Sequence, residues 1–291
     1  MTAVKFKTAA AGLFALAVFA GFHSVAVGAM DWPSETAGLI RNFGANDTGK
    51  PVLGMVFSGD TEILAAERGE VIFSRGRDGR ASRLPSPLGA WTAVDHGDGL
   101  ISIYSRYDTE SQPPARVERQ DTIAASGISG WSSRNGFFFQ VYDRRERRWI
   151  NPAMIMTPQR EILPPQILSV ELRNAQGVPI QAWNVSQGRY TVVVNTNIPR
   201  APRDTFFAPQ RIICLVNGTE AGSLNFEAIS ARDGVLMVNR NGLVPAKQVY
   251  AASPAFEVAD IFLNRGQVSL EIIVQDISGN SSGHIIRMIV N

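Results

Sequence analysis

The stretch that decides the fold runs from Val52 to Pro152 and consists of short apolar runs separated by turn residues. It contains AVDHGDGL at residues 93–100, ISIYSR at residues 101–106 and GFFFQV at residues 136–141. β-branched and aromatic residues favour extended strands, and the intervening glycine and aspartate favour tight turns. Because helical periodicity is nearly absent, we predict an all-β first half with strands at residues 71–73, 91–94, 101–104 and 137–142.

Beyond this stretch the same pattern continues after a proline-rich segment. Four prolines between residues 152 and 165 interrupt regular strand pairing. We therefore predict a first domain over residues 30–157, a linker over residues 158–165 and a second domain over residues 166–291. The second domain has short strand-like runs with turn signals between them, which favours a β-sandwich. These runs are residues 167–172, 190–194, 212–216, 236–238, 268–274 and 285–290.

The first 29 residues have the three parts of a secretory signal. Basic Lys5 and Lys7 precede a mostly apolar run over residues 9–22, and small residues end at Ala29. This layout predicts a signal peptide over residues 1–29 and export to the periplasm or cell envelope. The alternative is an uncleaved N-terminal anchor, although the apolar run is short for the ~20 residues of a membrane span. Only in that case do we expect contact with a membrane.

Composition indicates a globular protein without a strongly charged partner. The chain is 45% apolar and 19% charged, which is typical of folded domains. Removing Lys5 and Lys7 from the 28 basic residues leaves 26, which equals the 26 acidic residues. A net charge of zero gives no reason to expect nucleic acid as a partner.

In its order and spacing, the series between Val52 and Pro152 resembles the M23 (LytM or lysostaphin-like) peptidase domain. The series also includes the turn at residues 59–60 and RGEVIF at residues 68–73. The resemblance implies an antiparallel β domain built around a zinc-dependent peptidoglycan peptidase site. The segment VQDISGNS at residues 274–281 resembles the Asp-x-x-Gly-Asn turn of bacterial immunoglobulin-like domains, which implies an immunoglobulin-like β-sandwich for the second half.

The resemblance also implies where a metal site would lie, and residues that cannot bind zinc stand there. The family's metal-binding His and Asp on an early strand correspond to Val52 and Val56. Its catalytic His in a Tyr-x-His step corresponds to Arg106, and its late His-x-His pair corresponds to Gly136 and Phe138. Zinc is bound in proteins by thiolate, imidazole or carboxylate. None of these five residues supplies one, so we predict no metal, no cofactor and no catalysis.

The histidine content makes this conclusion independent of the alignment. The chain contains three histidines, His23, His96 and His284. His23 lies in the predicted signal peptide and His284 lies in the predicted second domain. Only His96 remains in the peptidase-like region, so an ordinary M23 zinc site is excluded in any register.

Two polar groups allow alternative interpretations. For Asp95, His96 and Asp98 we favour a turn in which the Asp side chains cap backbone amides. A residual metal-dependent hydrolase would instead need these three residues together with Asp60 and Glu62. The densest run of charged residues is 144–148, directly after the strand predicted at residues 137–142. There we expect a solvated hairpin tip. The alternative is a patch that binds phosphates, formed by Arg144, Arg145, Arg147 and Arg148.

These features predict a non-catalytic exported protein. The vacated ligand positions are expected to form a groove with an apolar floor, which can take an extended peptide or a helix. Degenerate LytM domains of secreted proteins, where known, activate cell-wall amidases, and some bind peptidoglycan. The resemblance therefore implies as partner an envelope amidase or other cell-wall hydrolase, or peptidoglycan itself. The alternatives are a residual metal-dependent peptidoglycan hydrolase of the M23 type and a structural or adhesive envelope protein.

Overall fold

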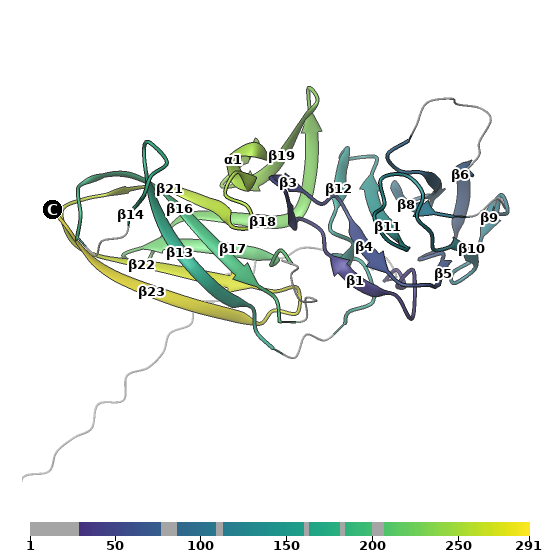
Figure 1. Ribbon diagram of the computed structural model, residues 1–291, viewed down its shortest axis with the longest axis horizontal. Helices are drawn as coiled ribbons and strands as arrows, with labels where there is room; N and C mark the ends of the chain where they lie inside the picture. The colour runs from purple at the N-terminus through teal and green to yellow at the C-terminus, as the bar shows by residue number, and fades with distance from the viewer. Residues whose placement is uncertain (1–28, 77–85, 109–112, 160–162, 181–183, 200–206) are drawn as a thin grey trace, which may run out of the picture.

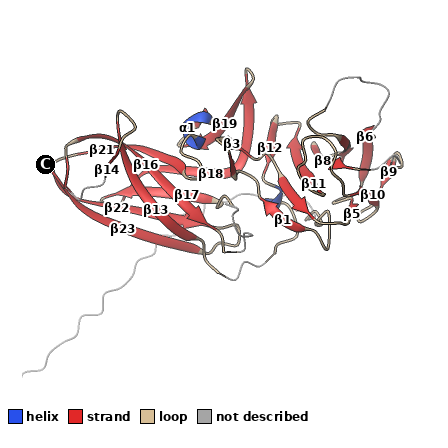
Figure 2. Cartoon of the chain, viewed as in Figure 1, coloured by secondary structure: helices blue, strands red, loops and turns tan. Residues whose placement is uncertain are grey.

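The computed structural model describes residues 29–76, 86–108, 113–159, 163–180, 184–199 and 207–291. Regular structure in these ranges is nearly all strand, as the sequence predicts, and the helical segments are short (Figure 2). The predicted signal peptide lies outside the described residues except for Ala29, so export stays a prediction. Within the described ranges, no helix has both the length and the apolar character that crossing a membrane requires.

The first half is built on an antiparallel sheet in the order β4-β11-β8-β7-β6. Its strands are β4 (Met55–Ser58), β6 (Gly69–Arg75), β7 (Ala90–Asp95), β8 (Leu100–Tyr107) and β11 (Gly136–Asp143). All four strands predicted for this half lie within them. Shorter strands complete it: β1 (Gly38–Arg41) pairs with β4, β9 (Arg116–Val117) with β6, β2 (Asn46–Asp47) with β3 (Lys50–Pro51), and β5 (Glu62–Leu64) with β10 (Thr122–Ala125).

Strand β11 matters most for the site because both of its faces are covered. Phe137, Phe139 and Val141 point into the core of the first half, where Phe137 stacks on Phe57 with ring centroids 4.7 Å apart. Successive side chains of a strand point to opposite faces of the sheet. Phe138 therefore lies on the other face, where it belongs to a separate small apolar cluster.

The second half consists of two sheets that pack face to face on one core. One sheet has the order β14-β13-β16-β21, with β13 (Gln166–Asn174), β14 (Pro179–Ile180), β16 (Gly188–Asn197) and β21 (Phe256–Leu263). The other has the order β15-β23-β22-β17-β18, with β15 (Asn184–Val185), β17 (Arg211–Val216), β18 (Thr219–Arg232), β22 (Gly266–Gln275) and β23 (Ser281–Val290). This half is two-layered, and its immunoglobulin-like identity stays a prediction. Beside it lie β19 (Val235–Arg240), β20 (Leu243–Pro245) and α1 (Lys247–Tyr250).

Strand β12 (Arg148–Ile150) joins the two halves. It pairs with β11 on one side and with β18 on the other, so the sheet of the first half continues into the second (Figure 1). Three residues of the first half, Phe43, Leu53 and Trp149, pack in the core of the second. The chain then forms a short 3-10 helix (Pro152–Met154) before the predicted linker, of which residues 160–162 lie outside the described ranges.

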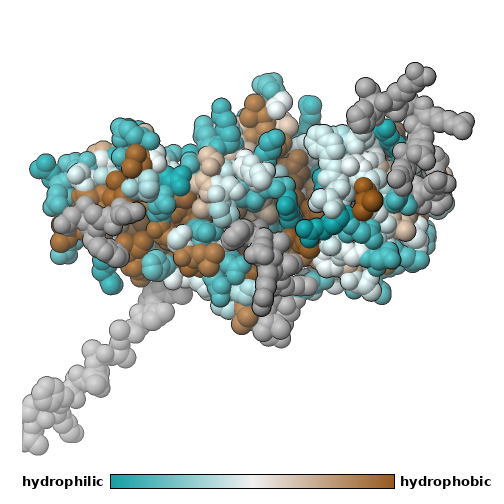
Figure 3. Space-filling model, viewed as in Figure 1, coloured by the Kyte–Doolittle hydropathy of each residue, from teal (hydrophilic) through white to brown (hydrophobic). Residues whose placement is uncertain are grey.

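Apolar side chains are exposed mainly over the second half on the face seen in Figure 3. Along β23, Met288 and Val290 are buried in the core, whereas Ile285 and Ile289 are exposed. This alternation is expected for a strand with one face on a core and one face toward solvent. Among the described residues of the first half, the most exposed large apolar side chain is Trp131, at 76%.

Candidate functional site

The sheet brings four of the five vacated ligand positions together. Phe138 of β11 lies opposite Val56 of β4 on one side and opposite Ser105 of β8, the neighbour of Arg106, on the other. Val52 follows β3 and packs against Phe138. We refer to this group as the Phe138 cluster, and it consists of Ala45, Val52, Val56, Leu88 and Phe138.

The Phe138 cluster is packed, which corrects the expectation of an open apolar floor. The exposed fraction is 8% for Val52 and 7% for Phe138. Gly54 makes room for the ring, because a Cβ at Gly54 would lie 3.0 Å from the ring atom Cε2 and 2.2 Å from the carbonyl oxygen of Phe139. The aromatic ring is thus buried beside Val52 and Val56, two of the predicted metal positions.

Gly136, the fifth position, has no room for a side chain. A Cβ at this residue would lie 2.0 Å from the carbonyl oxygen of Phe57, far closer than any real contact. The backbone is held on both sides, since Gly136 pairs with Ser58 of β4 and exchanges two hydrogen bonds with Gly127, of 2.9 and 3.0 Å. A histidine at this position would require β4 and β11 to move apart.

Arg106 covers the Phe138 cluster. Its guanidinium Cζ lies 4.8 Å from the centroid of the Phe138 ring, a cation–π contact. Its backbone has a φ of 68°, uncommon for a residue with a side chain, and its amide donates a 2.8 Å hydrogen bond to the carbonyl of Leu88. The Nε atom is buried and has no hydrogen-bond partner among the described residues.

The charges around Arg106 do not compensate it fully. Burial lowers the pKa of Arg106, and the nearby Arg41 lowers it further, whereas Asp47 raises it. Asp47 is itself paired with Arg41. Among the described residues that act on Arg106, one cation, Arg41, and one carboxylate, Asp47, are therefore already paired with each other.

His96 has a structural position at the end of β7. Its Nδ1 lies 2.8 Å from the carbonyl oxygen of Arg68, and its Nε2 lies 2.9 Å from the hydroxyl of Ser102. The Ser102 hydroxyl donates in turn to the hydroxyl of Tyr104, which also accepts a 2.8 Å hydrogen bond from the amide of Ala66. Both ring nitrogens are engaged, so neither is open to a metal or a substrate.

The two aspartates beside His96 act on the backbone of the turn. Asp95 accepts a hydrogen bond from the amide of Gly97, and Asp98 accepts one from the amide of Leu100. The second carboxylate oxygen of Asp95 lies 3.1 Å from the guanidinium of Arg144. This arrangement is the capped turn that the sequence favoured over a metal site.

The four arginines at residues 144–148 lie at the hairpin between β11 and β12. Arg144 is paired with Asp95, and the side chain of Arg145 lies against Gly99. Arg147 and Arg148 line a surface depression together with acidic side chains, Glu146, Glu227 and Asp233. Because the four arginines face different neighbours, they do not form one continuous basic patch.

The side chains present do not fit a zinc ion. Across the described ranges, no group of three or more His, Cys, Asp and Glu side chains is placed to hold a metal. The Phe138 cluster offers only apolar side chains and the cation of Arg106. Asp60 and Glu62 lie elsewhere, at the start of β5, whose partner is β10. No chemical step can therefore be routed through a metal at the vacated positions.

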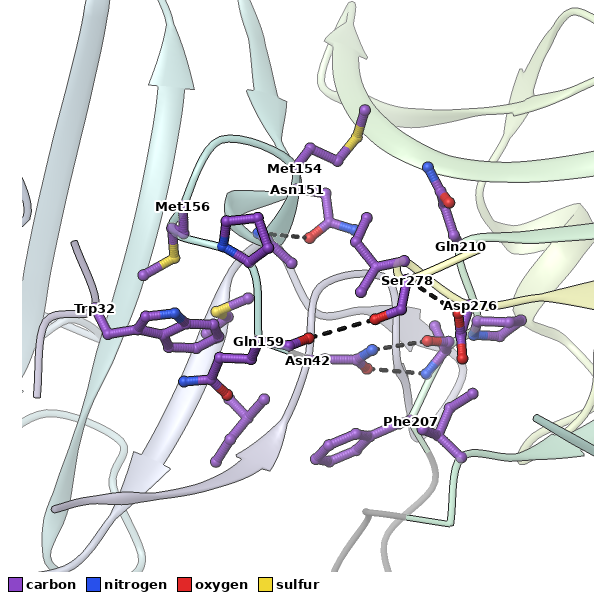
Figure 4. A pocket seen from close by; sticks show the side chains of 18 residues that line it. Trp32, Asn42, Asn151, Met154, Met156, Gln159, Phe207, Gln210, Asp276 and Ser278 are labelled. Carbon is purple, nitrogen blue, oxygen red and sulfur yellow. Dashed lines mark hydrogen bonds between the residues drawn. The ribbon is translucent and has the colours of Figure 1, made fainter. Parts of the chain in front are cut away.

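A hollow that the sequence did not indicate lies at the junction of the two halves (Figure 4). It has a volume of about 330 Å³ and a mixed lining that includes Trp32, Met154, Met156 and Phe207. Asn42 ties the halves together here, since its side-chain amide donates a 2.7 Å hydrogen bond to the carbonyl of Ala208 and its oxygen accepts a 2.9 Å bond from the Ala208 amide. These contacts bridge 166 residues of sequence, so no local pattern could reveal the hollow.

Comparison with known proteins gives one described family. Residues 52–152 match the model of Peptidase family M23. A second family model matches residues 164–291. No curated protein matches the chain. The chain thus contains a peptidase M23 domain in its first half.

Three solved structures illustrate what this chain is similar to. A mutant of the catalytic domain of the prophage-encoded M23 protein EnpA from Enterococcus faecalis is 17% identical, with 42% of this chain and 94% of that chain covered and a TM-score of 0.35. The SpoIIQ–SpoIIIAH pore-forming complex is 19% identical, with 44% and 90% covered and a TM-score of 0.36. A zinc-containing peptidase from Vibrio cholerae is 20% identical, with 43% and 39% covered and a TM-score of 0.36. At such TM-scores the likeness supports no functional conclusion.

Proposed function

We propose that this chain is a non-catalytic, exported M23-like protein that binds a component of the cell envelope. The component is a cell-wall hydrolase such as an amidase, whose activity the chain regulates, or it is peptidoglycan itself. The predicted signal peptide supports export to the periplasm or envelope. The M23 domain supports a role at the cell wall.

The observation that carries the proposal is the buried ring of Phe138 at a residue where we predict a histidine of the M23 metal site. A catalytic zinc site needs three protein ligands and an open position. Support comes from the Phe138 ring, which is 7% exposed and lies under the guanidinium of Arg106, and therefore leaves no open position beside it. Gly136 adds a second obstacle, because the Phe57 carbonyl leaves no room for a side chain there.

A binding role is supported by what remains of the domain. The strands that would hold a catalytic site are intact and form one antiparallel sheet. Beside the Phe138 cluster, the loop that carries Trp131 leaves this side chain 76% exposed, and its amide donates a 3.1 Å hydrogen bond to the carbonyl of Pro87. Exposed tryptophan is common where proteins bind partners.

The proposal is tested with the mature chain, residues 30–291, purified under zinc-replete conditions. Zinc content, release of muropeptides from purified sacculi, and retention on the same sacculi are measured together with recovery of envelope amidases in a pull-down. We expect retention on sacculi or recovery of an amidase, without stoichiometric zinc and without muropeptide release. Stoichiometric zinc accompanied by muropeptide release would show that the chain is a hydrolase.

A matched pair of variants locates the binding surface. Arg106→Gln and Arg116→Gln each remove one positive charge from the first half, but Arg116 is an exposed residue of β9, on the opposite edge of the sheet from β4. Weaker retention or recovery with Arg106→Gln alone places the partner at the Phe138 cluster. Equal binding by wild type and both variants would remove the cluster from the proposal.

A further inference from the structure

Arg106 is a partly buried cation whose side chain lacks hydrogen-bond and ion-pair partners among the described residues. Its side chain makes no hydrogen bond and no ion pair with any described residue, and Nε is fully buried. Of the three guanidinium nitrogens, only Nε is both fully buried and without a partner. The two terminal nitrogens keep contact with solvent. A partly buried charge without a partner is costly, which makes such a site receptive to an anion.

We propose that Arg106 anchors a carboxylate of a peptide ligand, with its guanidinium held over Phe138. This inference rests on the proposed binding function and specifies its ligand. A guanidinium presents donors in a planar fork that matches the two oxygens of a carboxylate. Because Nε faces the buried side, the open fork is the end formed by the two terminal nitrogens.

The position of the guanidinium is fixed by its surroundings. The Phe138 ring supports its face at 4.8 Å, and the hydrogen bond from the Arg106 amide to Leu88 fixes the start of the side chain. Phe138 is itself held in the Phe138 cluster by Val52 and Val56. A side chain placed in this way loses little further freedom when it binds, which favours affinity.

The local charge favours a single carboxylate. Arg41 and Arg106 are both cationic, and among the described residues Asp47, which is paired with Arg41, is the one acid that acts on Arg106. One bound carboxylate would bring this group to neutrality. A phosphate dianion would overcompensate it, so a carboxylate is the better match in charge.

The rim beside Arg106 favours a peptide as the carrier of that carboxylate. The carbonyl of Leu88 accepts the hydrogen bond from the Arg106 amide, and the Leu88 side chain packs in the Phe138 cluster. The loop after Gly127 packs against the same stretch, since a Cβ at Gly130 would lie 2.5 Å from the amide nitrogen of Gly89. This loop exposes Ile128 and Trp131 by 57% and 76%. An apolar rim next to a cation suits an apolar residue next to an acid group.

Calorimetric titration of the mature chain with three small peptides tests the inference. The probes are N-acetyl-Ala-Ala with a free carboxylate, the same dipeptide as its C-terminal amide, and N-acetyl-Glu-Ala amide, which carries its acid on a side chain. We expect a carboxylate probe to bind about tenfold or more tightly than the amide, as for a hydrogen bond to a charged group. The better of the two acids identifies the α-carboxylate or the side-chain carboxylate as the source.

The variants make the assignment specific. Arg106→Gln should remove the difference between acid and amide, Arg106→Lys should keep part of it, and Arg116→Gln should leave it unchanged. Circular dichroism checks that each variant is folded, and the comparison of acid with amide on the wild type does not depend on any variant. Equal binding of acid and amide, no binding of any probe, or unchanged discrimination in Arg106→Gln each overturns the inference. Retained binding to sacculi or amidase in those cases leaves the proposed function standing, whereas zinc-dependent muropeptide release removes it.

Discussion

The guanidinium of Arg106 lies 4.8 Å from the centroid of the Phe138 ring, so two residues predicted to stand at catalytic and metal positions of the M23 family contact each other. Such a contact stabilises by about 0.5–2 kcal/mol, depending on how far the cation is desolvated. Burial lowers the pKa of Arg106, as expected for a cation that is partly withdrawn from water. Phe138, its apolar neighbours and Arg106 therefore form a packed unit.

Loss of the Phe138 ring should destabilise the first half. Phe138→Ala removes a side chain that is 7% exposed, and we expect a loss of about 3–5 kcal/mol in the free energy of unfolding. Phe138→Leu keeps most of the apolar volume and should cost clearly less. Urea unfolding followed by circular dichroism measures both. A loss below about 1 kcal/mol for Phe138→Ala would mean that the cluster is not packed as described.

Gly136 should be intolerant of any side chain. Gly136→Ala would place a Cβ 2.0 Å from the Phe57 carbonyl oxygen, so β4 and β11 must separate. The matched control is Gly38→Ala, because Gly38 also pairs with Ser58 but its Cβ would meet nothing closer than 3.9 Å. We expect a lower melting temperature for Gly136→Ala and a nearly unchanged one for Gly38→Ala. Equal melting temperatures would refute the close approach.

Much of the strand layout was predictable from local pattern. The apolar run at residues 101–104 lies within β8, and the run at residues 268–274 lies within β22. The turn around His96 was also predictable, because Asp and Gly at that spacing cap backbone amides. The strand β21 was missed although Phe256 and Val258 alternate with polar residues there, a signal that was readable.

What the sequence did not reveal depends on contacts between distant segments. The pairing of β12 with β18 brings Trp149 opposite Ile229, and no local pattern specifies that partner. The sequence indicated that Val52, Val56 and Phe138 lie together. It did not indicate that the Phe138 ring would fill the expected groove between them. That closure requires the absence of a side chain at Gly54 and the placement of Arg106, both of which are tertiary facts.

The two halves should unfold together because β12 belongs to both. Trp149 sits in this strand and packs in the core of the second half. We expect one cooperative transition for the mature chain in differential scanning calorimetry, and a broadened or split transition for Trp149→Ala. A wild-type chain that already shows two independent transitions would contradict the coupling.

Stability should fall at alkaline pH in part through Tyr104. Burial raises the pKa of Tyr104 to about 12, against the opposing effect of hydrogen bonds from Ala66 and Ser102. The unfolded chain, with a tyrosine pKa of about 10, loses the proton first. Stability is therefore complete below pH ~10 and declines up to pH ~12, by about 3 kcal/mol for this residue.

Tyr104→Phe separates this effect from other titrations. The variant leaves the Ala66 amide without its acceptor, which should cost about 1–3 kcal/mol near neutral pH. Its stability should then fall less steeply than that of the wild type above pH ~10. Burial also raises the pKa of Tyr107 and Tyr250, so a residual decline is expected. Parallel pH curves for wild type and Tyr104→Phe would exclude Tyr104 as a contributor.

The most direct test of the central claim is the release of muropeptides from purified sacculi by the mature chain, measured across a zinc titration with an active M23 peptidase as positive control. Because Phe138 is buried at a predicted metal position and Arg106 lies over its ring, we predict no release at any zinc concentration while the control digests the same sacculi. Release that rises with added zinc and disappears on chelation would contradict the account.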